Sequence, residues 1–268
     1  MLFKPTCESI LGLMWELPIR SPLGEGQRAD APVYYVEQTD STMDDARRLV
    51  QRGAPSGTVV TADYQRTGRG RRAGRSWHSL PRESLMFTLM LHRPAEPVTR
   101  SFVMAAALCR LLEREAGLHA EVKWPNDVLV GGRKVSGILA DHENEWLYLG
   151  VGLNVHQTAF PEGLAAPATS IAIETASGDA RPEPGRYDRD RLLVGLLSSY
   201  LQCQADWHRR ISQRLWMRGA EVSVSVPYGT PITGRLVGVA EDGCLLIDAG
   251  EVHRLAAGEV SLTRGCHE

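Results

Sequence analysis

Residues 121–155, "EVKWPNDVLVGGRKVSGILADHENEWLYLGVGLNV", constrain the fold more than any other stretch of the chain. Short apolar runs alternate in this segment with turn residues: the Pro-Asn-Asp of 125–127, the Gly-Gly of 131–132 and the "HENE" of 142–145. A Gly-Gly pair between two apolar runs is a hairpin signal. The segment therefore predicts strands that are joined by tight turns.

Helices and further strands are predicted on both sides of this segment. "SLMFTLML", Ser84–Leu91, is a nearly continuous apolar run, which is typical of a buried strand. "DSTMDDARRLVQRG", residues 40–53, has the pattern of a capped helix, with Ser41 or Thr42 as the N-cap and Gly53 at its end. The remaining predicted elements are strands over 33–38 and 57–65, helices over 99–116 and near Ser170, and one or two helices over 188–217.

The two ends of the chain differ from its middle. From about Gly219 apolar and polar residues alternate, with turn residues at "PYGTP", "EDG" and "DAGE". Several short strands at this spacing predict a small SH3-like β-barrel as a second domain. Residues 1–31, which contain Pro18, Pro22 and "GEG", predict at most a short helix before a loose linker.

Composition narrows the class of protein. The chain has 268 residues and a formal net charge of −2 at pH 7, with 30 basic and 32 acidic residues. Nucleic-acid-binding domains usually carry a broad basic surface, so any such contact here would rest on one local segment. The five cysteines form no CxxC pair and have no zinc-like spacing, which favours free thiols in a reducing cytoplasm. No stretch is typical of a signal peptide or a membrane span.

The segment Thr67–Trp77, "TGRGRRAGRSW", is a local basic exception with four arginines and three glycines. Glycines let the backbone approach a ligand, and successive N–H groups can hold an anion. Arginines add paired donors that suit carboxylate and phosphate groups. The segment predicts either an anion-binding loop or a flexible basic loop that binds RNA or nothing in particular.

Lysine is scarce, since only Lys4, Lys123 and Lys134 occur among the 30 basic residues. A bias towards arginine codons accounts for the general depletion but not for two lysines within "KWPNDVLVGGRK". A compact ammonium and a planar guanidinium are not interchangeable, so a site that needs the former resists replacement. Lys134 opens an apolar strand, where it either meets an anion or keeps its head in water at the end of a hairpin.

Two further patterns have a functional and an ordinary interpretation. Asn126 can donate to a phosphate and Asp127 can hold Mg²⁺, although an Asn-Asp turn needs no ligand to explain it. "GVGLNV", 150–155, is a strand thinned by glycines, which marks either the close approach of a ligand or a simple bulge.

Taken in order, "STMDDA", "QRTGRGRRAGRSW", "KWPNDVLV", "RKVSGILAD" and "GVGLNV" closely resemble the motifs of the biotin protein ligase family. The resemblance covers the chain from about Val33 to its C-terminus. It implies an α+β fold, with a mixed β-sheet flanked by helices like that of class II tRNA synthetases and an SH3-like barrel. The implied organisation is an extension over 1–31, a catalytic domain over 32–217 and a C-terminal domain over 218–268.

The resemblance also implies a two-step reaction. Biotin and ATP, with Mg²⁺, would form biotinyl-5′-AMP, and a lysine of a biotin carboxyl carrier protein or domain would then take the biotin. Lys134, Arg69 and Arg71 would be catalytic, and Asp127 would be the metal ligand. The implied biotin-binding residues are Ser41, Thr42, Met43, Gln65, Arg69, Gly70, Arg71, Lys134 and Gly152, the last beneath the biotin rings. The implied ATP- or adenylate-binding residues are Arg69, Arg71, Arg72, Trp77, Lys123, Asn126, Asp127, Lys134 and Asn154.

Three departures from the family pattern qualify these expectations. Family members commonly carry Asn where this chain has Met43. The arginine-rich motif is one residue longer than usual, so either Ala73 or Gly74 fills its second turn. About 30 residues precede the catalytic part, too few for a winged-helix DNA-binding domain, so we expect a cytoplasmic ligase without a DNA partner or a repressor role.

Other functions stay open at this stage. The general fold and the adenylation chemistry are shared with lipoate ligases, which makes a lipoate-type ligase the nearest alternative. An RNA-binding module that uses the Arg/Gly loop is a second alternative. Family members include dimers, so a homodimer is one expectation.

Overall fold

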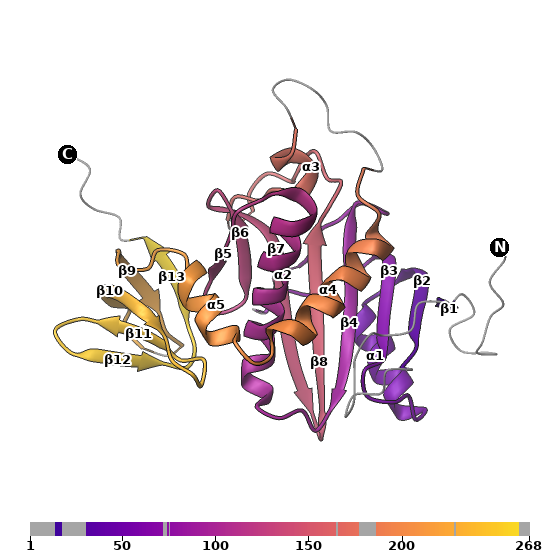
Figure 1. Cartoon of the computed structure of the whole chain (residues 1–268), viewed down its shortest axis with the longest axis horizontal. Coiled ribbons are helices and arrows are strands. Elements are labelled where there is room, and N and C mark those ends of the chain that lie inside the picture. Colours follow the sequence, from indigo (N-terminus) through magenta and orange to yellow (C-terminus); the bar gives the residue numbers. More distant parts are fainter. Residues whose placement is uncertain are drawn as a thin grey trace.

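The computed structural model describes residues 14–17, 31–71, 74, 76–164, 166–176, 186–227 and 229–262. These residues form an eight-stranded sheet with helices on both faces and a separate five-stranded sheet near the C-terminus (Figure 1). The fold is therefore α+β, as expected from the sequence.

The large sheet has the strand order β1-β2-β3-β4-β8-β7-β6-β5. The pair β2–β3 is parallel and the other neighbouring pairs are antiparallel, which confirms a mixed sheet. The strands are β1 (Met14–Leu17), β2 (Val33–Thr39), β3 (Val59–Gln65), β4 (Ser84–His92), β5 (Ala120–Lys123), β6 (Asp127–Val130), β7 (Arg133–Glu143) and β8 (Trp146–Asn154).

The strands predicted within 121–155 are confirmed as the meander β5-β6-β7-β8. Gly131 and Gly132 join β6 to β7 and have φ values of 55° and 74°, which glycine adopts without steric cost. Asn144 turns β7 into β8 with a φ of 53°. Asn126 lies in the turn between β5 and β6, so the polar residues of "KWPND" lie at strand ends as the sequence predicted.

Helices cover the two faces of the large sheet unequally (Figure 1). Helix α1 (Thr42–Gln51) contacts β3, β4 and β8 on one face. On the other face lie α2 (Arg100–Ala116), which follows a 3-10 turn at Pro97–Thr99, then α4 (Arg189–Cys203) and α5 (Trp207–Arg214). A short helix α3 (Ile171–Glu174) begins after Ser170, which confirms the predicted helix there.

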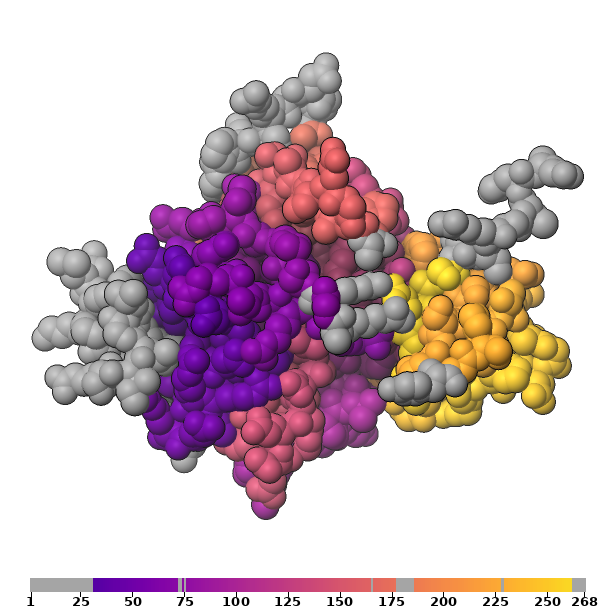
Figure 2. All heavy atoms as spheres, turned by 180° about the vertical axis from the view of Figure 1, so that it is seen from behind, coloured from indigo at the N-terminus to yellow at the C-terminus, as the bar shows by residue number. Residues whose placement is uncertain are grey.

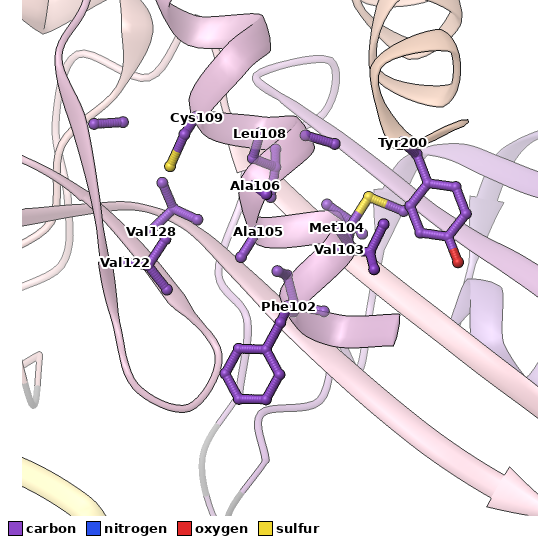
Figure 3. Packing of buried hydrophobic residues seen from close by; sticks show 14 of the residues in the cluster. Phe102, Val103, Met104, Ala105, Ala106, Leu108, Cys109, Val122, Val128 and Tyr200 are labelled. Carbon is purple, nitrogen blue, oxygen red and sulfur yellow. The ribbon is translucent and has the colours of Figure 1, made fainter. Parts of the chain in front are cut away.

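The main hydrophobic core lies between the sheet and α2 (Figure 3). Ala105, Ala106 and Ala107 let α2 approach the sheet closely, and Leu108 and Tyr200 fill the space towards α4. Each fully buried Leu or Phe contributes about 1.5–3 kcal/mol relative to an exposed side chain. The described cysteines Cys109, Cys203 and Cys244 are free thiols, as expected, while Cys7 and Cys266 lie outside the described residues.

The N-terminal segment corrects one expectation. A short helix at most was predicted within 1–31, but Met14–Leu17 forms strand β1 and pairs antiparallel with β2. The physical reason is that β2 would otherwise expose a row of unpaired backbone groups, which any extended segment can satisfy. The rest of residues 1–30 lies outside the described part of the chain.

The C-terminal sheet has the strand order β12-β11-β10-β9-β13 and is antiparallel throughout. Its strands are β9 (Glu221–Ser225), β10 (Ile232–Val239), β11 (Leu245–Asp248), β12 (Val252–Leu255) and β13 (Glu259–Leu262). The three predicted turns fall between consecutive strands. The SH3-like assignment and the boundary at 217/218 stay predictions.

A buried carboxylate ties the end of β3 to the segment before β4. Asp63 accepts a hydrogen bond of 2.6 Å from Oη of Tyr35 and lies 2.5 Å from Nη2 of Arg189 at the start of α4. Its Oδ2 lies 3.3 Å from Nε of Arg82, whose backbone N–H also donates to the Asp63 carbonyl. Burial and the bond to Asp63 raise the pKa of Tyr35.

We expect Asp63→Ala to lower the free energy of unfolding by about 3–5 kcal/mol, because it leaves the mostly buried Arg189 without its carboxylate. Tyr35→Phe serves as the control and should cost only about 1 kcal/mol, the value of one hydrogen bond. Denaturant unfolding at pH 7 measures both. Equal, small losses would show that Asp63 does not hold this end of the sheet.

The same network has a pH signature. A raised Tyr35 pKa stabilises the fold fully below the pKa of an unfolded tyrosine, about 10, and this stability is lost as the pH rises through the folded value. The parent protein should therefore lose stability above pH 10 more steeply than Tyr35→Phe. The free energy of unfolding of both proteins is measured between pH 8 and pH 11, and equal slopes against pH would contradict this.

Candidate functional site

Two adjoining pockets lie on the face of the large sheet that carries α1. Figure 2 shows the molecule from behind the view of Figure 1, with the chain from residue 31 in indigo and violet and the C-terminal sheet in orange and yellow. The smaller pocket holds about 70 Å³ and the larger about 330 Å³. Gly70, Arg71, Trp77, Asn126 and Lys134 line both, so these five residues mark where the pockets meet.

The nine residues that the family resemblance assigns to biotin all line the smaller pocket. They come from the start of α1, the end of β3, the Arg/Gly loop, β7 and β8. Segments up to about 110 residues apart in the chain are thus brought to one place. The residues of this pocket that sequence reasoning missed include Phe87, Thr88, Gly137, Leu139 and Gly150.

Most residues expected to bind the nucleotide line the larger pocket, namely Arg71, Trp77, Lys123, Asn126, Asp127, Lys134 and Asn154. Arg69 lines only the smaller pocket, and Arg72 lies outside the described residues. Sequence reasoning missed several lining residues that follow β8 and one from the C-terminal sheet, Phe160, Leu164, Ala168 and Glu259 among them. No local motif marks them.

The first turn of α1 forms one end of the smaller pocket. Ser41 is the N-cap, and its Oγ accepts a hydrogen bond from the Met43 N–H. Oε1 of Gln65 accepts hydrogen bonds from N and Oγ1 of Thr42, at 2.8 and 3.1 Å. These bonds fix the Gln65 amide at the pocket wall.

Met43 also lines this end, where other family members commonly have Asn. Its side chain is buried, and its methyl group lies 3.0 Å from the position that a Cβ on Gly150 would take. An apolar thioether therefore replaces an amide at this wall. Nε2 of Gln65 points to the sulfur of Met86, so two thioethers flank the polar pair Thr42 and Gln65.

The Arg/Gly loop is closed by backbone bonds at both of its ends. Trp77 N–H donates to the Gly68 carbonyl, and Arg69 pairs antiparallel with Ser76. Gly74 has a φ of 79°, a left-handed conformation that suits glycine. Gly74 thus supplies the left-handed turn in the longer motif, while Arg72, Ala73 and Arg75 lie outside the described residues.

Gln157, which follows β8, holds the backbone that leaves the Arg/Gly loop after Trp77. Nε2 of the buried Gln157 donates to the carbonyl of His78 at 3.2 Å, and Oε1 of Gln157 accepts from Oγ of Ser84 at 3.0 Å. The backbone after Trp77 is therefore fixed against the core.

The indole of Trp77 packs directly on the bare backbone of two neighbouring strands. A Cβ on Gly152 would overlap the indole, and a Cβ on Gly137 would lie 3.3 Å from its Cζ3. Gly152 and Gly137 are cross-strand partners. The indole Nε1 is buried without a hydrogen-bond partner among the described residues, so a ligand oxygen placed there would recover about 1–3 kcal/mol.

Lys134 lies across the same backbone floor. Its Cε and Nζ are 3.0 Å from the position of a Cβ on Gly137, so its stem folds back along β7 towards the pockets. Nζ forms an ion pair of 2.7 Å with Oδ1 of Asp127 and lies 5.9 Å from the centre of the Trp77 ring. The structure thus favours the interpretation in which Lys134 meets an anion over that of a solvated hairpin end.

The other cations of the site also have partners. Arg69 pairs with Asp44 of α1, and Nη2 of Arg71 donates to the Gly258 carbonyl of the C-terminal sheet at 2.7 Å. Nζ of Lys123 lies 5.2 Å over the ring of Trp216. The positive groups are therefore held in place by the protein before any ligand arrives.

Two amide side chains contribute to the pocket walls through the backbone. Nδ2 of Asn126 donates to the Ile138 carbonyl at 2.8 Å, and Nδ2 of Asn154 donates to the Thr169 carbonyl at 2.8 Å. The first bond ties the turn before β6 to β7, and the second ties the end of β8 to the segment before α3. The ligand roles expected for Asn126 and Asn154 stay predictions.

No group of three or more potential metal-ligating side chains occurs among the residues that the structure describes. Asp127 lines the larger pocket as a single carboxylate paired with Lys134. Mg²⁺ that arrives with a nucleotide is usually bound by one or two carboxylates plus phosphate oxygens. Asp127 is a carboxylate of the kind that such an arrangement uses, and the Mg²⁺ role expected for it stays a prediction.

Comparisons with known proteins agree with this geometry. Residues 35–155 match the biotin/lipoate A/B protein ligase family. The biotin--[acetyl-CoA-carboxylase] ligase of Mycobacterium tuberculosis is 33% identical over 230 residues, which cover 80% of this chain and 82% of that protein. The bifunctional ligase/repressor BirA of Bacillus spizizenii is 30% identical over 252 residues, covering 85% of this chain and 73% of that protein.

Solved structures give the same result. The biotin protein ligase from Aquifex aeolicus in complex with biotin and ATP superposes with a TM-score of 0.73 at 29% identity, covering 87% of this chain and 99% of that chain. The chain therefore belongs to the biotin/lipoate A/B protein ligase family, and within it to the biotin protein ligases. It is a ligase.

None of the described helices is both long and apolar enough to cross a membrane. The cytoplasmic location stays a prediction.

We expect Gly152→Ala to destabilise the fold by about 1–3 kcal/mol, the cost of overpacking, because the new methyl group overlaps the Trp77 indole. Gly150→Ala should cost less, since its neighbour is the flexible end of Met43. Denaturant unfolding of both variants measures the difference.

A double variant isolates the contact. In a Trp77→Ala background, Gly152→Ala should lose most of its cost, because the overlapping ring is gone. Additive losses would show that the indole does not pack on Gly152.

Proposed function

We propose that this protein is an ATP-dependent biotin protein ligase that activates biotin to biotinyl-5′-AMP and transfers it to a lysine of a biotin carboxyl carrier protein or domain. The observation that carries the proposal is the junction of the two pockets at Lys134. The smaller pocket brings together the nine residues assigned to biotin, and the larger one lies beyond Lys134 and Asp127.

The pocket shapes suit two different substrates. The smaller pocket has a polar end at Thr42 and Gln65, which suits a ligand with a urea-like group, and a glycine floor that carries the Trp77 indole in the ligand-free protein. The larger pocket holds about 330 Å³, within the range of small-molecule sites. A biotin carboxylate that points from the first pocket would meet the α-phosphate of a nucleotide in the second beside Lys134.

The chemistry follows from this placement. The carboxylate oxygen attacks the α-phosphorus and pyrophosphate leaves, so negative charge accumulates between the two pockets. Lys134 and Arg71 line both pockets and are held by Asp127 and by the Gly258 carbonyl. Donors that are oriented in advance towards developing charge lower a barrier most.

The alternatives have less support. A lipoate-type ligase would need no polar pair such as Thr42 and Gln65 at the end of the pocket. The RNA-binding alternative loses support because a formal net charge of −2 gives the chain no broad basic surface. The expectations of no repressor role, no DNA partner and a homodimer stay predictions.

We expect Lys134→Ala to slow formation of biotinyl-5′-AMP by about 10²- to 10³-fold, the loss of one preorganised charge-stabilising donor. Lys134→Arg should also be impaired, because a planar guanidinium does not replace the compact ammonium in the tight space beside Gly137. Single-turnover adenylation and biotin-dependent pyrophosphate exchange measure both variants.

The matched control is Arg133→Ala. Arg133 precedes Lys134 on β7, but its side chain is exposed and pairs with Glu174. Its adenylation rate should stay within a few-fold of the parent. A parental rate in Lys134→Ala would remove Lys134 from the chemistry, and exchange with lipoate instead of biotin would favour the alternative ligase.

A further inference from the structure

The Arg/Gly loop is attached to the rest of the protein at several places along its length. At its entry, the backbone N–H groups of residues 66–67 donate to the carbonyls of residues 39–40, at 2.9 and 3.0 Å. Further along, Arg71 donates to a carbonyl of the C-terminal sheet. Between these points Arg69 reaches helix α1, where its Nη2 lies 2.5 Å from Oδ2 of Asp44. This ion pair ties the middle of the loop to the first turn of α1.

The Arg69–Asp44 pair joins two walls of the smaller pocket. Arg69 lines that pocket from the loop, and Ser41, Thr42 and Met43 line it from the start of α1. Asp44 directly follows these residues but lines neither the smaller nor the larger pocket. Any effect of Asp44 on a ligand in the smaller pocket therefore passes through Arg69 or through the fold of α1.

A second arginine holds the Asp44 carboxylate in place. Nη1 of Arg47 lies 3.2 Å from Oδ1 of Asp44, so the two oxygens of one carboxylate meet two different guanidinium groups. Arg47 also pairs with Asp141 and, at 3.0 Å, with Glu143 of β7. The side chains of Arg47 and Asp44 are only 22% and 26% exposed. The carboxylate that meets Arg69 is thus anchored to the large sheet through Arg47.

The two arginines depend on Asp44 to different degrees. Without the Asp44 charge, Arg47 would still have the carboxylates of Asp141 and Glu143. For Arg69, Asp44 is the one carboxylate within ion-pair distance among the residues that the structure describes. Neutralising Asp44 would therefore release Arg69 and leave Arg47 in place.

We propose that Asp44 is a positioning residue for biotin binding, which holds Arg69 against α1 and so keeps the Arg/Gly loop closed over the smaller pocket. The inference rests on the proposed function, in which biotin occupies this pocket. Biotin would then lie between the loop and the first turn of α1, and parting of these two walls would speed its release. Lys134 and Arg71 have other partners, so the reaction centre does not depend on this pair.

This role predicts a particular kinetic signature. An interaction that holds the substrate equally in the ground state and in the transition state lowers KM without changing kcat. Arg69, which the family resemblance places among the catalytic residues, would then act in binding and not in the chemical step. Asp44 would contribute to the KM for biotin alone.

An aspartate in the first turn of a helix also has an ordinary structural role. Its charge favours the positive end of the helix dipole, and both Asp44 and Asp45 occupy this turn of α1. Such a role persists when Arg69 is replaced, whereas a positioning role through Arg69 does not. Removing Asp44 in the presence and in the absence of Arg69 therefore separates the two roles.

The central variant is Asp44→Asn, which removes the charge and nearly keeps the shape. Asp40→Asn is the matched control, because Asp40 pairs with the loop residue Arg66 at 2.7 Å but lines neither pocket. Both substitutions raise the net charge by one unit, so the long-range attraction for the biotin carboxylate changes equally. Isothermal titration of the full chain gives the Kd for biotin, and biotin-dependent pyrophosphate exchange gives KM and kcat.

We expect Asp44→Asn to raise the Kd and the KM for biotin by about 3- to 5-fold, the scale of one partly exposed ion pair, and to leave kcat within about two-fold of the parent. Asp44→Glu keeps a carboxylate and should stay within about two-fold in both constants. In an Arg69→Gln background, Asp44→Asn should add no further loss. Asp40→Asn should bind biotin like the parent.

A parental Kd in Asp44→Asn would overturn the inference, as would an equal rise in Asp40→Asn or an additive loss in the Arg69→Gln background. Tighter biotin binding in Asp44→Asn would also overturn it, because Asp44 would then compete with biotin for Arg69. If Asp44→Asn fails to fold, Arg69→Gln alone breaks the same pair and should raise the Kd at least as much. A parent protein that neither binds biotin nor shows biotin-dependent exchange would instead refute the proposed function.

Discussion

The site depends on an area of bare backbone at the centre of the large sheet. Gly137 and Gly152 face each other across β7 and β8, and Gly150 precedes Gly152 on the same face. β8 is paired with β4 on one side and β7 on the other, so its backbone groups are satisfied without side chains. Because no Cβ stands there, the Trp77 indole and the Lys134 stem can lie flat on the sheet. The position of both groups is thus set by residues that have no side chain.

Charge at the site is balanced locally in the ligand-free protein. Lys134 pairs with Asp127, Arg69 with Asp44 and Arg66 with Asp40. These pairs are at least partly exposed, and such pairs are worth only about 0–1 kcal/mol each. An anionic ligand can therefore exchange places with a carboxylate at little cost. This explains how a nearly neutral chain holds a dense group of cations without a broad basic surface.

The sequence predicted most of the elements because their signals are local. Ser41 caps α1, Gly131 and Gly132 form a hairpin, and the small residues of α2 pack on the sheet. The strand at 14–17 was missed because it forms only through pairing with β2, which leaves no strong pattern in its own four residues. Glu259 and Phe160 were missed for a related reason, since only tertiary packing brings them to the larger pocket.

The C-terminal sheet positions residues of the candidate site through hydrogen bonds. Nε1 of Trp124 donates to the Gly243 carbonyl at 3.0 Å, so the turn that carries Asn126 and Asp127 rests on this sheet. The Gly258 carbonyl holds Arg71, and a Cβ on Gly258 would lie 2.8 Å from the Ser225 carbonyl oxygen, which keeps β13 close to β9. Both segments that meet at the pocket junction are therefore positioned from the same sheet. A displacement of that sheet would move the Arg/Gly loop and the 123–127 turn together, so the two would respond as one unit even though 45 residues, 78–122, separate them in the chain.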